Sequence, residues 1–369
     1  MLRISQSPSA QRDEHKICIR GIFGLLGSRI ALAIRKNPDM RLVVGIAKND
    51  PTLRDALSTM QPLPDDIRKE LFAEKMYLDD KHNVVRELNA MQDMVRFEPA
   101  DQLNLAKECD LIIDAASPGS AQKWLGRYDA FKGLVVLQSG EYPLGRSIVP
   151  PKKMPHESED KLFRQGDCVL SGIVPVLSYL EPISKRVIMH IVTQYTEKLN
   201  DYTTDQRLGS TYIRDEVKQQ VESELAPLFP ETELVLLGVS QVSGLSYYTA
   251  TLLVETKCPI SGQEIKELLE NRPRIRVVPG IKSTYEISHF HKERMQALGR
   301  EIPPITVFGS DLNSCAKSTM FRIMIAIDYR YIAVLPNIDA TRMLVQNMDG
   351  EEAMRITDRN MGFISFEQK

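Results

Sequence analysis

The sequence lacks the features of a membrane-spanning, secreted or metal-holding protein. No stretch approaches the roughly eighteen apolar residues that a helix needs to cross a bilayer, and residues 1–16 contain no apolar core of signal-peptide length. The five cysteines lie far apart without a CxxC pair, which argues against a disulfide framework and against a zinc site. We therefore expect a cytoplasmic protein with no membrane partner and no metal.

The chain also lacks a charge excess of either sign. Its 47 basic and 49 acidic residues leave a formal charge of -2, so no global field exists to hold nucleic acid, and we expect no nucleic-acid partner. We find no internal repeat and no low-complexity tract. A chain of 369 residues exceeds what one hydrophobic core usually organises, which favours two domains.

The sequence predicts a complete βαβ unit near the start of the chain. KICIRGIFG is a short apolar run bounded by glycine, and LLGSRIALAIRKNP has apolar residues at helical spacing before a proline. MRLVVGIAKND then reads as a second strand, which would lie parallel to the first. Residues 51–104 look like a helical excursion with one short strand at MVRFEP.

Two further buried strands end in turns of small residues. They are read from AKECDLIIDAASPG and AFKGLVVLQSGEYPLG, and they continue the parallel sheet. The prolines and charges of SIVPPKKMPHESED, residues 147–160, are typical of a linker. Beyond it, β-branched and aromatic runs such as RVIMHIVTQYT and SYYTATLLVETK favour a mostly antiparallel sheet, with helices between them and a last helix at IDATRMLVQNM.

The turn GIFGLLG carries the most informative motif. Gly21, Gly24 and Gly27 follow a strand and open a helix, where free N–H groups and the helix dipole suit a pyrophosphate that must approach the backbone closely. The spacing is GxxGxxG rather than GxGxxG. The alternative is a glycine-rich turn that only packs the helix on the sheet.

The end of the second strand bears on the choice of cofactor. An acidic residue there would accept the ribose 2′-hydroxyl, but Lys48 comes first and Asp50 only later. Lysine suggests tolerance of a 2′-phosphate, so NADP is at least as favoured as NAD, unless Lys48 merely points to solvent. The turns AASPG, from Ala115 to Gly119, and QSGE, from Gln138 to Glu141, lie where the ligand crevice of an open α/β sheet forms.

Histidines and other donors offer weaker signals. His289 and His291 would point to different faces of a helix, unlike the i, i+4 pair of a metal site. His190 sits in an apolar strand, as a core residue or as an acid–base group facing a substrate. Other possible donors to a small anionic substrate are Tyr195, Lys198, Tyr212 and Arg214.

The order of these motifs resembles the archaeal-type (type II) glyceraldehyde-3-phosphate dehydrogenases over almost the whole chain. The most specific pieces are GIKSTYEI, LGR at Leu298 to Arg300 and NIDATR at Asn337 to Arg342. The resemblance implies an α/β chain in which a Rossmann NAD(P)-binding domain, residues 16–166 and 330–369, is interrupted by an α+β domain with a mostly antiparallel sheet, residues 167–329, after a leader of residues 1–15. It also implies a homo-oligomer, dimer or tetramer, formed through the second sheet.

The motifs and the resemblance together predict the cofactor-lining residues. They are Gly21, Ile22, Phe23, Gly24, Leu25, Leu26, Lys48, Ala116, Ser117, Pro118, Gly119, Gln138, Ser139, Gly140 and Asn337.

The catalytic machinery of the family is missing. Family members attack the aldehyde with a cysteine in the pattern SCNTTGL, but counting back from LEP at Leu180 to Pro182 places Ser171 there, with Cys168 three residues too early. The family's histidine, in an SHH stretch, is replaced by the region of Thr211 and Tyr212, and its phosphate-holding arginine has no counterpart in TQYTEKLND. Ser171 is then a substrate hydrogen-bonder or a strand-end residue.

These observations favour an NAD(P)-dependent oxidoreductase that transfers hydride to a small carbonyl or imine without a covalent intermediate, with Ser171, Tyr212 and His190 as candidate catalytic residues. One alternative is a catalytically silent binding or regulatory relative, because cysteine and histidine are lost together. Another is an aldehyde dehydrogenase that uses Cys168.

Overall fold

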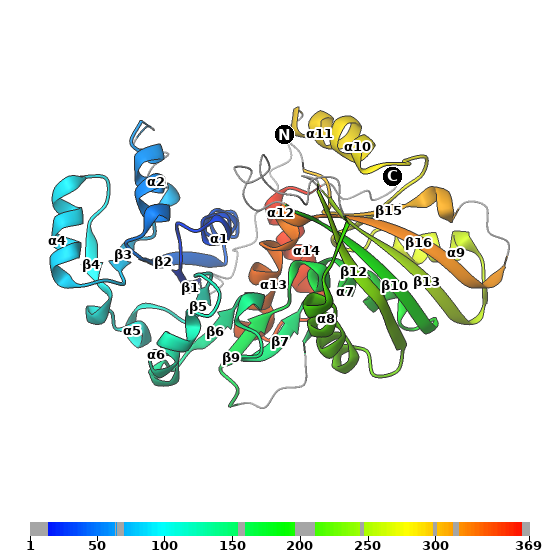
Figure 1. Ribbon diagram of the computed structural model, residues 1–369, viewed down its shortest axis with the longest axis horizontal. Coiled ribbons are helices and arrows are strands. Elements are labelled where there is room, and N and C mark those ends of the chain that lie inside the picture. The colour runs from blue at the N-terminus through cyan, green and yellow to red at the C-terminus, as the bar shows by residue number, and fades with distance from the viewer. Residues whose placement is uncertain are drawn as a thin grey trace, which may run out of the picture. The chain divides into compact units, whose positions relative to one another are not determined.

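The computed structural model describes residues 14–62, 64, 70–153, 159–195, 211–243, 247–297, 301–312 and 317–363 (Figure 1). The chain separates into two compact units, Met1–Leu137 and Gln138–Lys369. Each unit has its own sheet, which confirms the predicted α/β class with a Rossmann-like parallel sheet and a second sheet. The finer assignment of residues 16–166 with 330–369 to one domain, and of 167–329 to the other, stays a prediction.

The first unit is built on parallel strands in the order β4-β3-β2-β1-β5-β6. Its elements are β1 (His15–Arg20), α1 (Leu25–Arg35), β2 (Met40–Ala47), α2 (Pro51–Met60), β3 (Lys75–Leu78), α4 (His82–Met91), β4 (Phe97–Pro99), η1 (Ala100–Gln102), α5 (Leu105–Glu108), β5 (Leu111–Asp114), η2 (Ala121–Trp124), α6 (Leu125–Ala130) and β6 (Leu134–Leu137). The central strands are apolar and buried along most of their length, because helices cover both faces of such a sheet.

The strand order places a topological switch point between β1 and β5. From β1 the chain builds outward to β2, β3 and β4, then returns to β5 on the other side of β1. In open α/β sheets, ligands bind beyond the carboxyl ends of the strands at such a point. The Gly21 turn follows β1 and the Ala115–Gly119 turn follows β5, so both predicted turns meet at this edge.

The helical excursion of residues 51–104 was predicted only in part. The strand at MVRFEP is confirmed as β4, and α2 and α4 are helical. The prediction missed β3, whose four residues KMYL are too few to show a period.

The second unit contains a seven-stranded sheet in the order β11-β12-β10-β13-β16-β15-β14 and a small group of strands in the order β9-β7-β8. Its elements are η3 (Ser139–Glu141), β7 (Arg146–Val149), β8 (Lys152–Lys153), β9 (Leu162–Gln165), α7 (Cys168–Leu180), β10 (Ser184–Tyr195), β11 (Thr211–Ile213), α8 (Asp215–Leu228), β12 (Glu233–Ser243), β13 (Tyr247–Ile260), α9 (Gly262–Leu269), β14 (Ile275–Val278), α10 (Thr284–Glu286), η5 (Ile287–Lys292), α11 (Glu293–Ala297), β15 (Ile305–Phe308), η6 (Gly309–Asp311), β16 (Ser318–Asp328), α12 (Tyr329–Ile332), α13 (Leu335–Val345) and α14 (Gly350–Met361). Most pairings in the larger sheet are antiparallel, as predicted.

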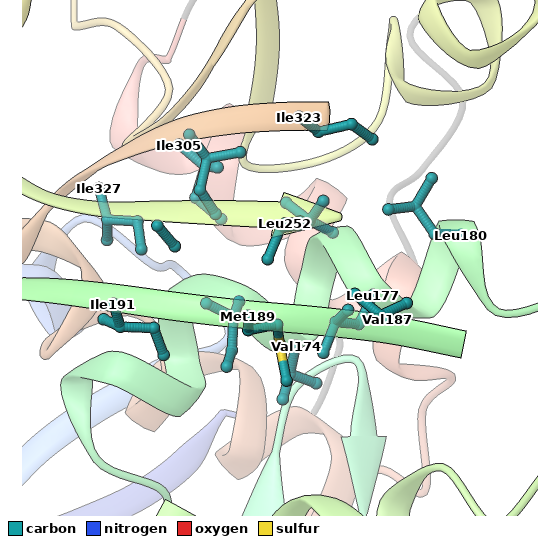
Figure 2. Close-up of a cluster of buried hydrophobic side chains, with 14 of the residues drawn as sticks. Val174, Leu177, Leu180, Val187, Met189, Ile191, Leu252, Ile305, Ile323 and Ile327 are labelled. Atoms are coloured by element: carbon teal, nitrogen blue, oxygen red, sulfur yellow. The ribbon is translucent and has the colours of Figure 1, made fainter. Parts of the chain in front are cut away.

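One face of the larger sheet holds the main core. Side chains of α7 pack against alternate residues of β10 and of its neighbouring strands, as the labelled Val174, Leu177, Met189 and Leu252 show in Figure 2. Because the side chains of a strand alternate between faces, the residues between them point to the other face. Polar side chains on opposite faces of the sheet therefore cannot contact each other.

Three local predictions for this unit were wrong. Residues 147–160 were read as a linker, yet β7 and β8 lie within them, while residues 154–158 fall outside the described part of the chain. Ser171, for which a strand end was one alternative, lies in the helix α7. IDATRMLVQNM lies in α13 but is not the last helix, because α14 follows it.

A buried ion cluster joins α13 and α14 to the start of β14. Arg274 donates to both carboxylate oxygens of Asp339 at 2.7–2.8 Å, and its Nε donates to Asp358. Thr357 donates to Asp339 and receives a hydrogen bond from Arg342. NIDATR therefore serves this cluster, in which two carboxylates pair with the buried guanidinium of Arg274.

Candidate functional site

The Gly21 turn is fixed by close backbone contacts that exclude side chains. Gly21 has φ +80, and a Cβ there would lie 2.7 Å from the backbone of Ala115. A Cβ at Gly27 would lie 2.1 Å from the Gly21 carbonyl oxygen. These two glycines are therefore required by the packing of β1, α1 and β5 on each other.

Gly24 has a different role in the same turn. It is the N-cap residue of α1, has no side chain to cap the helix, and would bring a Cβ only to 3.2 Å from the Gly21 oxygen. The first amides of a helix have no intrahelical acceptor, so those of Leu25 and Leu26 remain to be satisfied from outside the helix. Leu25 is 72% exposed, so this helix end faces solvent and suits an anion.

A buried ion pair holds the ends of β1 and β5 together beneath the turns. Arg20 Nη1 donates to the two oxygens of Asp114 at 2.9 and 3.0 Å and to Ser120 Oγ at 3.0 Å. Asp114 also accepts from the amide of Ala116, which shapes the Ala115–Gly119 turn. The pair thus positions one predicted cofactor-lining turn directly.

Two aromatic residues complete this buried cluster. The Arg20 guanidinium lies 4.7 Å from the centre of the Trp124 ring, and the Trp124 indole donates to Asp79, which follows β3. The Tyr128 hydroxyl donates to Asp114 at 2.7 Å. Burial, together with the Asp114 charge, raises the pKa of Tyr128, so it stays a donor to the carboxylate.

The end of β2 carries positive charge. Lys48 is exposed, whereas the Asp50 side chain is the N-cap of α2 and accepts from the amide of Leu53 at 3.1 Å. The Arg54 side chain reaches back to Asn49 Oδ1 at 3.4 Å, so a second cation lies at this strand end. Asp50 is thereby committed to its helix, which leaves Lys48 and Arg54 to face a ligand.

The remaining predicted cofactor residues divide into two groups. Ser117, Pro118, Gly119 and Gly140 are exposed in the turns after β5 and β6, whereas Ile22 and Phe23 are buried and Phe23 packs against Phe72 and Phe97. Gln138 and Asn337 are 199 residues apart, yet the Gln138 amide donates to Asn337 Oδ1 at 2.7 Å. Their part in cofactor binding stays a prediction.

Ser171 lies in the first turn of α7 and is 3% exposed. Its hydroxyl donates to the Gly166 carbonyl at 3.4 Å and accepts from the Gln165 amide at 3.2 Å. A buried hydroxyl that is already engaged lacks the adjacent base that a serine nucleophile needs. The strand-end alternative for Ser171 is wrong because the residue is helical.

Cys168, at the N-terminus of α7, belongs to a separate cluster. Its thiol lies 3.6 Å from the Tyr248 hydroxyl, and the Tyr248 ring stacks on Tyr329 with centroids 5.8 Å apart. Burial, with the charge of Asp167, raises the pKa of the Cys168 thiol to about 12. The thiol is therefore protonated at neutral pH.

Asp167 is the N-cap of α7 and accepts from the amide of Leu170 at 2.7 Å. Burial raises its pKa to about 6, against the opposing effect of that hydrogen bond. Sequence analysis missed Asp167 and Tyr248. Asp167 carried a signal, because an aspartate before an apolar run is a helix-start residue, whereas Tyr248 is brought to the site only by folding.

The structure does not bring His190 to Ser171. Met189 and Ile191 of β10 face the core with α7, so His190 points to the opposite face, where it is exposed and lies 3.3 Å from Ser240 Oγ. Tyr212 lies in β11, and its backbone pairs with Gln241 of β12. The side chains of Tyr195 and Tyr212 are not among the described ones. Lys198 and the LGR at Leu298 to Arg300 lie outside the described residues. Arg214 is engaged by Glu216.

The described residues include no group of three or more histidine, cysteine or carboxylate side chains that could hold a metal ion. Within the same residues, no helix combines the length and apolar character needed to cross a membrane.

Comparison with known proteins finds relatives along nearly the whole chain. It is 24% identical to a glyceraldehyde-3-phosphate dehydrogenase of Sulfolobus acidocaldarius over 94% of the chain and 96% of the relative. It is 25% identical to one of Hyperthermus butylicus over 93% and 96%. No protein-family model matches the chain.

Solved structures with a similar fold are aspartate-semialdehyde dehydrogenases. A probable member from Pseudomonas aeruginosa has a TM-score of 0.63 and 13% identity, covering 90% of this chain and 99% of that one. Aspartate semialdehyde dehydrogenase II from Vibrio cholerae, complexed with ASA, has a TM-score of 0.58 and 12% identity over the same shares. The sequence relatives agree with the predicted resemblance, and the chain is similar to the archaeal glyceraldehyde-3-phosphate dehydrogenases as a divergent relative.

Proposed function

We propose that the chain is an NAD(P)-dependent oxidoreductase that transfers hydride to or from a small carbonyl or imine compound without a covalent intermediate. The observation that carries the proposal is the uncapped N-terminus of α1, which lies behind the Gly21 turn at the switch point of the parallel sheet. The relatives bear dehydrogenase names, and the neighbouring folds are named for an aldehyde substrate.

The residues of the first unit fit a dinucleotide. The amides of Leu25 and Leu26 would hold the pyrophosphate, and Gly24 keeps this helix end free of a side chain. Lys48 and Arg54 would hold a ribose 2′-phosphate, so we propose a preference for NADP over NAD. When bound, the nicotinamide supplies or accepts a hydride.

The second unit supports non-covalent chemistry. A covalent route needs a thiolate or an activated hydroxyl, but Cys168 is a protonated thiol and Ser171 is buried with its hydroxyl engaged. The Cys168–Tyr248 pair instead offers neutral donors that can hydrogen-bond a carbonyl oxygen or an imine nitrogen.

Asp167 is the proposed proton donor to the carbonyl oxygen or imine nitrogen of the substrate. A carboxyl group with a pKa of about 6 exchanges protons near neutral pH, and it adjoins Cys168 at the start of α7. In the reductive direction, Asp167 would pass a proton to the oxygen or nitrogen of the substrate. Ser171, Tyr212 and His190 stay as untested predictions for the same step.

Leu25→Glu tests the helix N-terminus directly. The new carboxylate should stabilise α1 through the helix dipole, by about 0.3–1 kcal/mol, yet repel the pyrophosphate. Titration calorimetry should show that the affinity for NADPH falls at least about tenfold. The melting temperature should not decrease. Leu25→Gln is the matched neutral control and should bind normally. Equal affinity in wild type and Leu25→Glu, or no binding of either nicotinamide cofactor to wild type, refutes the proposed site.

Lys48→Glu tests the choice of cofactor. Replacing the cation with an acceptor for the ribose hydroxyl should lower the ratio of NADPH to NADH affinity by roughly tenfold, about 1.4 kcal/mol. Lys48→Gln should lower it less, because it removes charge without adding the acceptor. A ratio that is the same in all three proteins would show that Lys48 points to solvent.

Asp167→Asn tests the raised pKa by linkage. Because the carboxyl pKa is higher in the folded state than the ordinary 3.8, the wild type loses stability as pH rises from below 4 to above 6. Asparagine is an equally good N-cap and does not titrate. The free energy of unfolding of the variant, relative to that of wild type, should rise by up to about 3 kcal/mol between pH 4 and pH 7.5. A difference that is independent of pH contradicts the assignment.

A second candidate function is a catalytically silent binding or regulatory protein. The buried Ser171 and the protonated Cys168 favour it, since neither supplies the family's covalent step. Both candidates bind the cofactor, so turnover distinguishes them. Oxidation of NADPH by any of a panel of small aldehydes, ketones and imines supports the enzyme, and complete silence favours the binding protein.

We also propose that the chain forms a homo-oligomer through the open face of the seven-stranded sheet. Leu237 and Leu253 on this face are 63% and 38% exposed, and Met320 of the same face is 49% exposed. Exposed apolar residues gathered on one sheet face are typical of protein interfaces. Light scattering by the purified chain should give a dimer or tetramer mass, and a monomer mass would contradict the proposal.

A further inference from the structure

Arg276, on β14, is a buried cation whose charge has no partner among the described residues. It is 3% exposed, and its Nε donates to Thr306 Oγ1 of the adjacent strand at 3.0 Å. Its Nη2 has no hydrogen-bond acceptor. Burial lowers the pKa of Arg276 to about 10, so the guanidinium is still charged at neutral pH.

Three other buried arginines among the described residues are compensated by carboxylates. Arg20 is paired with Asp114, Arg164 with Glu224, and Arg274 with both Asp339 and Asp358. Removing a guanidinium from water without a counter-charge is costly. Arg276 therefore differs from its neighbour Arg274 in having donors that are prepared for an anion.

A second donor lies in the same buried region. Tyr247 is 1% exposed, and its hydroxyl has no hydrogen-bond partner of ordinary geometry, although the Ser288 hydroxyl lies beside it. Arg276 pairs with Thr306, Thr306 pairs with Ala326, and Tyr247 pairs with Asp328, two residues along from Ala326. Arg276 and Tyr247 therefore lie on the same face of the sheet. Asp328, the cross-strand neighbour of Tyr247, accepts a hydrogen bond from Arg330 at 3.1 Å.

We propose that Arg276, Tyr247 and Ser288 form a binding site for a small oxyanion, a phosphate or a carboxylate. The Arg276 Nη2 would donate to one oxygen, and the two hydroxyls would donate to the others. Guanidinium groups favour such oxyanions because the planar N–H donors match their oxygens. A water molecule can satisfy a hydroxyl, but it cannot neutralise the guanidinium charge.

The proposed site is independent of the proposed dinucleotide site and of the α7 cluster. Tyr248 faces the core side of the sheet, where its hydroxyl meets Cys168, and the adjacent Tyr247 faces the other side. Apolar residues around Tyr247, including Ile281, Ile287 and Phe308, separate this region from solvent. Anion binding here can therefore be present or absent whatever the fate of cofactor binding.

Thermal unfolding of the full chain tests the proposal with inorganic phosphate and acetate as probes at constant ionic strength. Wild type should gain melting temperature as the concentration of at least one probe rises, by about 3 °C at roughly ten times its dissociation constant, while chloride at equal ionic strength has less effect. Arg276→Met should abolish the gain. It should also melt above wild type in anion-free buffer, because an apolar side chain of similar length removes the uncompensated charge.

Two further variants complete the test. Tyr247→Phe removes only the hydroxyl and should weaken the anion's apparent affinity several-fold. Lys282→Met removes an exposed cation from the loop before α10 and should leave the response unchanged. The proposal is overturned if wild type shows no gain in melting temperature with either probe, if chloride reproduces the gain, or if Arg276→Met retains it. Should Arg276→Met fail to fold, equal affinity in wild type and Tyr247→Phe overturns it.

Discussion

The contact between the Gly21 turn and the Ala115 backbone is the constraint on which the first unit depends. β1 and β5 are parallel neighbours, and the chain leaves both strands at the same edge, so their turns compete for one space. Glycine at positions 21 and 27 lets α1 start directly above that contact. The helix dipole is thereby directed at the edge of the sheet, where the exposed turn after β5 also lies.

Buried charges do the remaining positioning in both units. Arg20 and Asp114 hold the ends of β1 and β5 and shape the Ala115–Gly119 turn, while Arg274 with Asp339 and Asp358 holds α13 and α14 to the start of β14. Part of what made NIDATR recognisable as a family motif is thus a structural ion cluster. Framework residues can therefore persist without the family's chemistry: the position that the resemblance assigns to the nucleophile, Ser171, holds a buried serine.

The sequence predicted the parts of this architecture that local patterns encode. The first βαβ unit, the turns after β5 and β6 and most strands of the second sheet follow from apolar runs bounded by glycine. The helix at residues 168–180 was not predicted, because VLSGIVPVLSYL is apolar on every side and a buried helix of this kind shows no helical period. The partners of Arg20, Cys168 and Arg276 lie 94, 80 and 30 residues away, and only folding brings them together.

The central claim is that the first unit binds a nicotinamide cofactor at the edge of its parallel sheet. Trp124 is the single tryptophan of the chain and lies against Arg20, directly beneath that edge. Excitation of Trp124 during titration with NADPH should therefore show saturable quenching of the indole emission together with sensitised emission from the bound nicotinamide. Unchanged tryptophan emission at saturating NADPH, with no sensitised emission, would contradict the account.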